Sequence, residues 1–216
     1  MSTVCIITCF FEINVIQYIQ YLIGRDNMIY NRDLFIKEIE KVNTHLNEHP
    51  LPAWEELPQF DLYMDQVIVL LGQYLAPDQT DDKFITASMI NNYVKLKIMP
   101  APIKKKYNKF HLAYLIIICS LKQTLSMATI QNIIPFDLDE QQVIIIYKNF
   151  VKNQKKVLEF TISQVDEIAR PIADESAQNP DRIHDLVLQL AMFSNIAKHL
   201  TEKIVNLQDD TIVKEK

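Results

Sequence analysis

Glycine is nearly absent from this sequence, since only Gly24 and Gly72 occur among its 216 residues. Tight β-hairpins usually need glycine at backbone positions with positive φ, so an architecture built mainly from such hairpins is disfavoured. Hydrophobic residues make up 49% of the chain, which is ample material for a buried core. The composition therefore predicts a folded, mainly helical protein.

Cysteine is also scarce. Cys5, Cys9 and Cys119 are too few and too unevenly placed for a disulfide framework, and Cys119 lies inside a strongly apolar run. This usage is typical of reduced thiols, so we expect a cytoplasmic protein.

Recognisable catalytic and metal-binding patterns are missing. The chain has no glycine-rich phosphate loop and no suggestive grouping of Ser, His and Asp. His184 and Asp185 form a dipeptide found in metal-dependent phosphohydrolases, but only His199 lies nearby as a further ligand. We therefore expect a surface histidine here, and a protein that is not an enzyme and has no cofactor or metal.

Acidic residues are absent between Lys83 and Phe136, a stretch that we call the basic segment. It carries eight lysines in a chain of net charge −5, so the rest of the chain carries −13. Lysines near phosphates release condensed counterions, which makes such a segment suited to a polyanion, most simply nucleic acid. The eight are Lys83, Lys95, Lys97, Lys104, Lys105, Lys106, Lys109 and Lys122.

The chain begins with an apolar stretch, Val4 to Ile23, that no Lys or Arg precedes. Polar side chains interrupt it and no small-residue cleavage site follows, so we expect neither a signal peptide nor a membrane span. The alternatives for the natural start are Met1 and Met28. The interrupting residues are Glu12, Asn14, Gln17 and Gln20.

Hydrophobic periodicity predicts several helices before the carboxy-terminal third. Between the first two, His49 to Pro58 carries three prolines and is expected to form an extended linker, with Trp54 packed down as its anchor. Pro100 and Pro102 predict a loop or edge hairpin. The expected helices span Tyr30 to Leu46, Asp61 to Leu75, Thr86 as N-cap to about Lys95 or Lys97, Lys109 to Leu125 after Asn108, and Met127 to about Ile134 after Ser126.

Two longer helices are predicted in the carboxy-terminal third, the first starting at a capping-box-like pair, Asp137 and Glu140, and the second after Asn179 and Pro180. Their apolar stripes must be buried on each other, on the rest of the chain or on a second subunit; we expect a homodimer. The last helix has the cleaner heptad seam, formed by Ile183, Leu190, Ala197 and Ile204 with Leu186, Phe193, Leu200 and Leu207.

Within the basic segment, the short helix has two unlike faces. Met89, Ile90, Tyr93 and Val94 form an apolar face, whereas the opposite face is polar without a single acid. Asparagine is a poor interior helix former but can pair with adenine, and lysine can reach guanine or phosphate. A solvated surface is the alternative interpretation. The polar face consists of Ser88, Asn91, Asn92 and Lys95.

The lysine run that follows, Lys104 to Lys106, would alternate faces in an extended strand, and Tyr107 could pack its ring while offering its hydroxyl to a phosphate. Together with the preceding helices, this order predicts a winged helix-turn-helix.

These residues resemble the DNA-binding domain of the MerR family of transcription regulators. Ile90 and Tyr93 match its recognition helix, Ile98 and Met99 match the apolar pair before the wing, and Tyr107 matches the tyrosine that closes the wing. Three positions depart from that pattern: Asn91 replaces an arginine, Asn92 an aromatic residue and Lys97 a glycine.

A closer resemblance covers Leu51 to Ile134. LPAWEELPQFDLYMDQV, MINNYVK, IKKKY and LKQTLSMATIQNII are similar to a bacterial family called domain of unknown function 1836, itself considered similar to MerR proteins. The resemblance implies a mainly α fold with a small β wing, and a cytoplasmic, bacterial DNA-binding regulator.

We therefore expect four parts: a hydrophobic extension (1–27), a helix with a proline-rich linker (28–60), a winged helix-turn-helix (61–135) and a helical region (136–216). The last region is expected to form a helical hairpin or a coiled coil. Its expected role is dimerisation or the binding of an unknown small-molecule effector. The expected function is sequence-specific regulation of transcription on double-stranded DNA, without a membrane. The alternative is a helical adaptor that binds a protein or an anionic surface through the basic segment. The expected DNA contacts are Thr86, Ser88, Asn91, Asn92, Tyr93, Lys95, Lys97, Lys104, Lys105, Lys106 and Tyr107.

Overall fold

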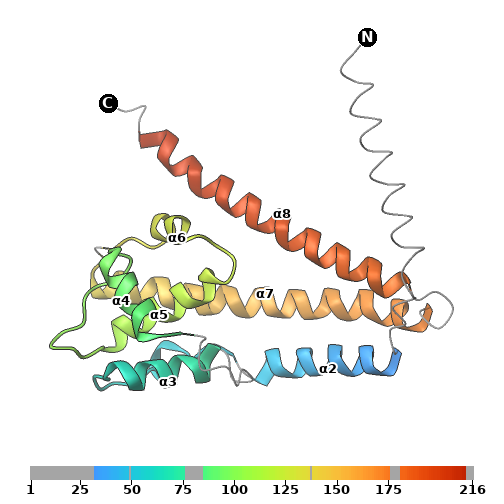
Figure 1. Ribbon diagram of the computed structural model, residues 1–216, viewed down its shortest axis with the longest axis horizontal. Helices are drawn as coiled ribbons and strands as arrows, with labels where there is room; N and C mark the ends of the chain where they lie inside the picture. The colour runs from blue at the N-terminus through green and yellow to red at the C-terminus, as the bar shows by residue number, and fades with distance from the viewer. Residues whose placement is uncertain (1–31, 49, 76–84, 137, 176–180, 213–216) are drawn as a thin grey trace, which may run out of the picture.

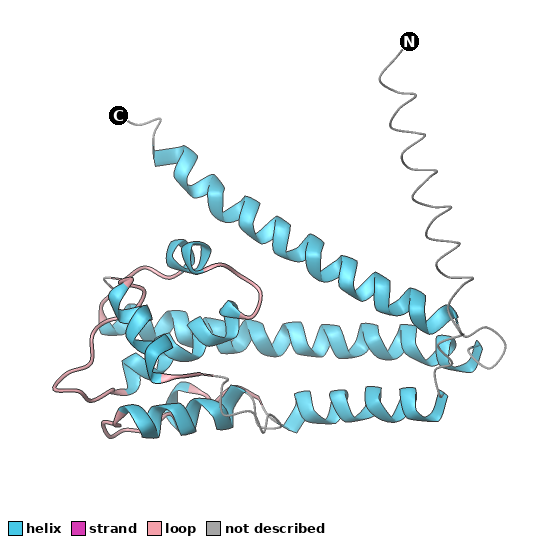
Figure 2. Ribbon diagram, viewed as in Figure 1, coloured by secondary structure: helices cyan, strands magenta, loops and turns pink. Residues whose placement is uncertain are grey.

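A computed structural model describes residues 32–48, 50–75, 85–136, 138–175 and 181–212. Within these ranges the chain is mainly helical, which confirms the expected mainly α class (Figure 2). No strand forms there, so the expected MerR-like winged helix-turn-helix with a β wing is not confirmed. The expectations for residues 1–27, for Pro77 to Lys83, for Asp137 and for Asn179 with Pro180 lie outside the described residues. The elements are α2 (Arg32–Glu48), the 3-10 turn η1 (Trp54–Glu56), α3 (Met64–Leu75), α4 (Ala87–Lys95), α5 (Lys109–Lys122), α6 (Met127–Ile133), α7 (Glu140–Glu175) and α8 (Asp181–Ile212).

Helix α5 is the centre of the main hydrophobic core. Nine consecutive residues, His111–Cys119, are buried, as is typical of a helix surrounded by other elements. Helices α3, α6 and α7 all pack against it, and α4 packs against α3. One cluster of buried side chains extends from Leu51 to Tyr147 and so crosses both boundaries expected at residues 60 and 135.

The proline-rich segment before α3 belongs to this core and is not the extended linker that we expected. Leu51 and Leu57 are buried. The Trp54 ring lies 5.4 Å from that of Phe110 and 5.9 Å from that of Tyr147, between centroids, so Trp54 anchors the segment as predicted. Prolines prevented a long helix here, but they did not prevent packing, because the segment carries three large apolar side chains.

The carboxy-terminal third contains the two long helices that the sequence predicted. Helix α7 starts later than expected, because the Asp139 carboxylate accepts a hydrogen bond from the Gln142 amide (2.8 Å) and the Gln142 side chain accepts one from the Asp139 amide (2.9 Å). This pair forms the capping box. Helix α2 lies along α7, while α8 packs on α7 near their junction and then diverges from it (Figure 1).

A second, smaller cluster holds the junction end of these helices together. It consists of Ile172, Ile183 and Leu186, with Phe35 of α2 packed against it. Only the first part of the α8 seam is therefore buried within the chain. In the described ranges, none of the helices combines the length and apolar character needed to cross a membrane.

Candidate nucleic-acid interface

Helix α4 presents the two faces that its periodicity predicted. Thr86 is the N-cap, and its hydroxyl accepts a hydrogen bond from the Met89 amide at 3.3 Å. Ile90 and Tyr93 are 0% and 1% exposed and fix the helix on the core. The opposite face is exposed and carries Ser88, Asn91, Asn92 and Lys95.

Past α4 the chain turns through a left-handed residue, Lys97, with φ of 55°. The amide of Ile98 donates to the Tyr93 carbonyl and the amide of Lys97 donates to the Val94 carbonyl, both at 3.0 Å. This is the Schellman arrangement, in which glycine is the usual residue at the left-handed position. The side chain of Lys97 is exposed, so its charge is available on the surface beside α4.

The lysine run forms a tight turn and not the extended strand that we expected. Ile103 and Lys106 exchange two backbone hydrogen bonds, of 3.0 and 2.9 Å. The two residues between them, Lys104 and Lys105, have φ of 50° and 64°. Positive φ at both central residues is the pattern of a type I′ hairpin turn, which normally selects Asn and Gly. We call residues 103–106 the wing turn.

The wing turn is attached to the start of α3. Leu62 and Tyr107 exchange two backbone hydrogen bonds, each 2.8 Å long, in an antiparallel bridge. The wing thus consists of two isolated bridges and no extended ladder, because only two residue pairs in the described ranges meet in this way. A β wing in the stricter sense is not confirmed.

No acidic side chain in the described part of the chain forms an ion pair with a lysine of the basic segment. Ion pairs there include Lys41 with Glu38, Lys148 with Glu55, and Lys155 with Glu159. Three lysines of the segment lie over aromatic rings instead, which orients them without neutralising their charge. They are Lys106 over Tyr63 (5.3 Å to the centroid), Lys109 over Trp54 (4.7 Å) and Lys122 over Tyr93 (5.7 Å).

Two residues expected to contact DNA are core side chains. Tyr93 is 1% and Tyr107 2% exposed, and the Tyr93 hydroxyl is buried, so Tyr93 cannot reach a phosphate without a rearrangement. Burial raises the pKa of both phenols. The Tyr93 hydroxyl has no hydrogen-bond partner, whereas the Tyr107 ring packs edge-on against His111, 5.7 Å between centroids. The expected contacts fail here because a tyrosine's aromatic ring favours burial more than its hydroxyl favours water.

His111 was not singled out by the sequence, yet it joins the wing to α5. The ring is 4% exposed. Nδ1 lies 3.2 Å from the Asn108 amide nitrogen and 2.5 Å from the Asn108 Oδ1, and Nε2 lies 3.0 Å from the Ala101 carbonyl oxygen. The tautomer decides which of these contacts are hydrogen bonds. Burial lowers the histidine pKa, against smaller opposing effects from the Ala101 hydrogen bond and Asp61. The signal in the sequence was the N-cap Asn108, three residues before His111.

Residues 52–150 match the family model of the Domain of unknown function (DUF1836). This range supports the resemblance seen in the sequence and extends it into α7. It also coincides closely with the cluster of buried side chains from Leu51 to Tyr147. No curated protein and no solved structure matches the chain.

Proposed function

We propose that this protein is a sequence-specific DNA-binding transcription regulator similar to the MerR type. In this proposal the exposed face of α4 enters the major groove and the wing turn contacts the DNA backbone or minor groove. Ser88, Asn91, Asn92 and Lys95 read or approach bases, while Lys97, Lys104, Lys105 and Lys106 hold phosphates.

The observation that carries this proposal is the positive φ angle of three lysines. In the described ranges, the residues with positive φ are Lys97, Lys104 and Lys105, and none of them is glycine. A left-handed conformation costs an L-residue with a side chain roughly 1 to 2 kcal/mol, which glycine would avoid. Such strain is concentrated at functional sites. Three exposed lysines at positions that favour glycine support a role for their charge.

The surface around them supports a polyanionic partner as well. Residues 85–136 contain no acid, and their lysines have no carboxylate partner within the described part of the chain. A membrane or protein adaptor would need the same charge but not the exposed amides of α4, which suit base edges. DNA is therefore the partner that accounts for both groups of side chains.

Dimerisation completes the proposal, because a two-fold symmetric regulator matches a palindromic site. From Leu190 to Leu207, α8 carries an exposed apolar stripe about 26 Å long. Its six large members expose on the order of 600 Å² per chain, so two copies would bury on the order of 1,200 Å², the size of a specific interface. The six are Leu190, Phe193, Ile196, Leu200, Ile204 and Leu207.

The proposal is tested by selecting binding sites from random duplex DNA and measuring affinity for the selected site at several salt concentrations. Replacing Lys104, Lys105 and Lys106 with alanine should weaken binding at every sequence and lower the salt slope by roughly two to three units. Failure to enrich any sequence would overturn the proposal in favour of the adaptor.

Asn91→Ala, in contrast, should alter the preference at one base pair by about 1 to 3 kcal/mol and leave the salt slope unchanged. If this variant weakened binding equally at all sequences, base readout by α4 would be ruled out. Asn149→Ala, at an exposed position of α7 outside the proposed interface, is the matched control for the loss of an asparagine side chain.

A further inference from the structure

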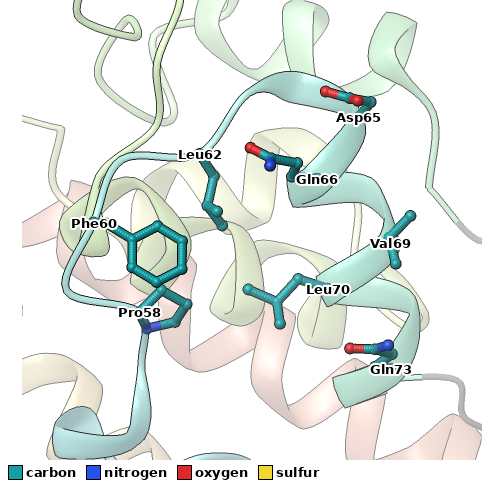
Figure 3. Close-up of a pocket in the computed structure, with 8 residues that line it drawn as sticks. All are labelled: Pro58, Phe60, Leu62, Asp65, Gln66, Val69, Leu70 and Gln73. Carbon is teal, nitrogen blue, oxygen red and sulfur yellow. The ribbon is translucent and has the colours of Figure 1, made fainter.

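An open groove lies between the loop before α3 and the exposed face of α3. Its volume is about 340 Å³. Figure 3 shows the Phe60 ring projecting from the loop and Leu70 rising from the helix on the facing side, with Pro58 beneath them. The groove runs along two neighbouring rows of α3 from Asp65 to Gln73, a length of about 12 Å or two helical turns.

The groove is unusually apolar for an exposed surface. Phe60 is 67% and Val69 62% exposed, and Tyr63, the residue before α3, is 52% exposed. Leu62 and Leu70 form the deeper part. Large apolar side chains grouped in this way on a surface indicate a binding site for another molecule.

The charged side chain in the groove lining is acidic, whereas Lys106 of the wing turn lies outside it, over the ring of Tyr63. Residues 51–75 carry four acids and no Lys or Arg. Asp65 lines the groove, and Gln66 and Gln73 supply amide groups. DNA is the less suitable occupant, because its phosphates would meet the Asp65 carboxylate. The four acids are Glu55, Glu56, Asp61 and Asp65.

We propose that this groove binds an amphipathic helix of a second protein, with apolar anchors one turn apart and Lys or Arg beside them. Two turns of α3 provide room for two or three such anchors, and an open groove of this kind suits a helix better than an enclosed small molecule. The Asp65 carboxylate in the lining favours a cationic partner and would repel an acidic one. A second copy of the chain is the competing occupant, and the molecular mass of the Val69→Arg variant distinguishes it from a second protein.

The inference goes beyond DNA binding and is tested independently of it. The probe is a synthetic helix of roughly 14 residues, about four turns, with Leu and Phe at i, i+3, i+4 and i+7 and Lys elsewhere. A matched peptide carries Glu in place of every Lys. Binding to the full chain is measured by titration calorimetry, and the contacted residues are located by amide chemical-shift changes.

We expect the lysine peptide to bind with shifts confined to residues 58–73. Val69→Arg and Asp65→Lys should each weaken it by at least about tenfold, as should the change to the glutamate peptide. Leu188→Arg on α8 is the matched control and should bind as well as the unchanged protein. Because Val69 is 62% exposed, Val69→Arg should retain the thermal midpoint.

Three results would overturn the inference. The first is equal binding of the lysine peptide to all variants, and the second is a set of shifts located on α8. The third is a halved molecular mass for Val69→Arg in light scattering, which would make a second copy the occupant. Affinity for the selected DNA should be unaffected by Val69→Arg, so that failure of the groove and failure of DNA binding are distinguishable.

Discussion

Lysine occupies left-handed backbone positions at both ends of the proposed DNA-binding surface. The sequence did not predict a left-handed turn at Lys104 and Lys105, because the residues that usually form a type I′ turn are Asn and Gly. The faces of α4, in contrast, were predictable, since Ile90 and Tyr93 recur at helical spacing and Thr86 is a favoured N-cap. Local periodicity can be read from a sequence. A strained turn beside a long-range backbone pairing, such as that of Leu62 with Tyr107, cannot.

The strain of the left-handed backbone at Lys104 and Lys105 leads to a prediction for these residues. Lys104→Gly with Lys105→Gly should raise the free energy of unfolding by about 1 kcal/mol, because relief of the left-handed strain exceeds the entropy that glycine adds to the unfolded chain. The same variant should lose affinity for DNA, with a salt slope lower by about two. Urea denaturation and salt-dependent anisotropy measure the two effects.

A matched control removes the same charge elsewhere. Lys152 and Lys156 are exposed on α7, and replacing both with glutamine should leave the salt slope as it was. Loss of stability in the glycine variant would contradict the strain argument, and unchanged DNA affinity would remove the lysine charge from the interface.

At the scale of elements, helices were predicted better than their connections. The bounds of α3, α4, α5 and α6 agree with expectation to within a few residues, because each has a cap or an apolar repeat. The segment around Trp54 was mistaken for a linker, since proline content reports what a backbone cannot form and not where its side chains pack. The hydrogen bond of 2.8 Å from the Tyr147 hydroxyl to the Pro52 carbonyl joins residues 95 positions apart, beyond any local signal.

The heptad seam of α8 gives a prediction for an element. Phe193→Asp with Leu200→Asp should convert a dimer into a monomer, because four buried carboxylates would face each other across the interface. Multi-angle light scattering measures the mass, and circular dichroism checks that the helices remain. Met192→Asp is the control, since Met192 is 63% exposed but lies off the stripe. A dimer that survives the double change would show that α8 is not the interface.

The whole molecule has a division of charge that its net value conceals. Residues 51–75, which include the groove at α3, contain acids and no Lys or Arg, and lysines without acids cover α4 and the wing turn. The sequence revealed the basic segment, but it did not place Phe60 and Val69 together, because this depends on how residues 58–62 fold back on α3. Separate surfaces for a polyanion and for a cationic helix would let one domain bind both at once.

Stability of the whole domain should depend on pH through His111. Its pKa is lowered by burial in the folded state, so the unfolded chain binds the proton more readily. Stability is then fully present above about pH 6.5 and is lost as the pH falls below that value, by at most about 1.4 kcal/mol per pH unit. Denaturation of the wild type and of His111→Gln from pH 7.5 to 5.5 measures this. Parallel pH profiles of the two proteins would assign the loss to other groups.

The contact between Tyr147 and Pro52 also decides how the chain can be divided. A fragment ending at Pro135 would lack α7 and leave the Trp54 ring without one of its two aromatic neighbours. The smallest piece able to fold alone, or to be transplanted into another protein, therefore runs from Leu51 to about Val151. Helix α8 also packs against α6, so the contact between these two helices joins the far part of α8 to the unit that carries the lysines.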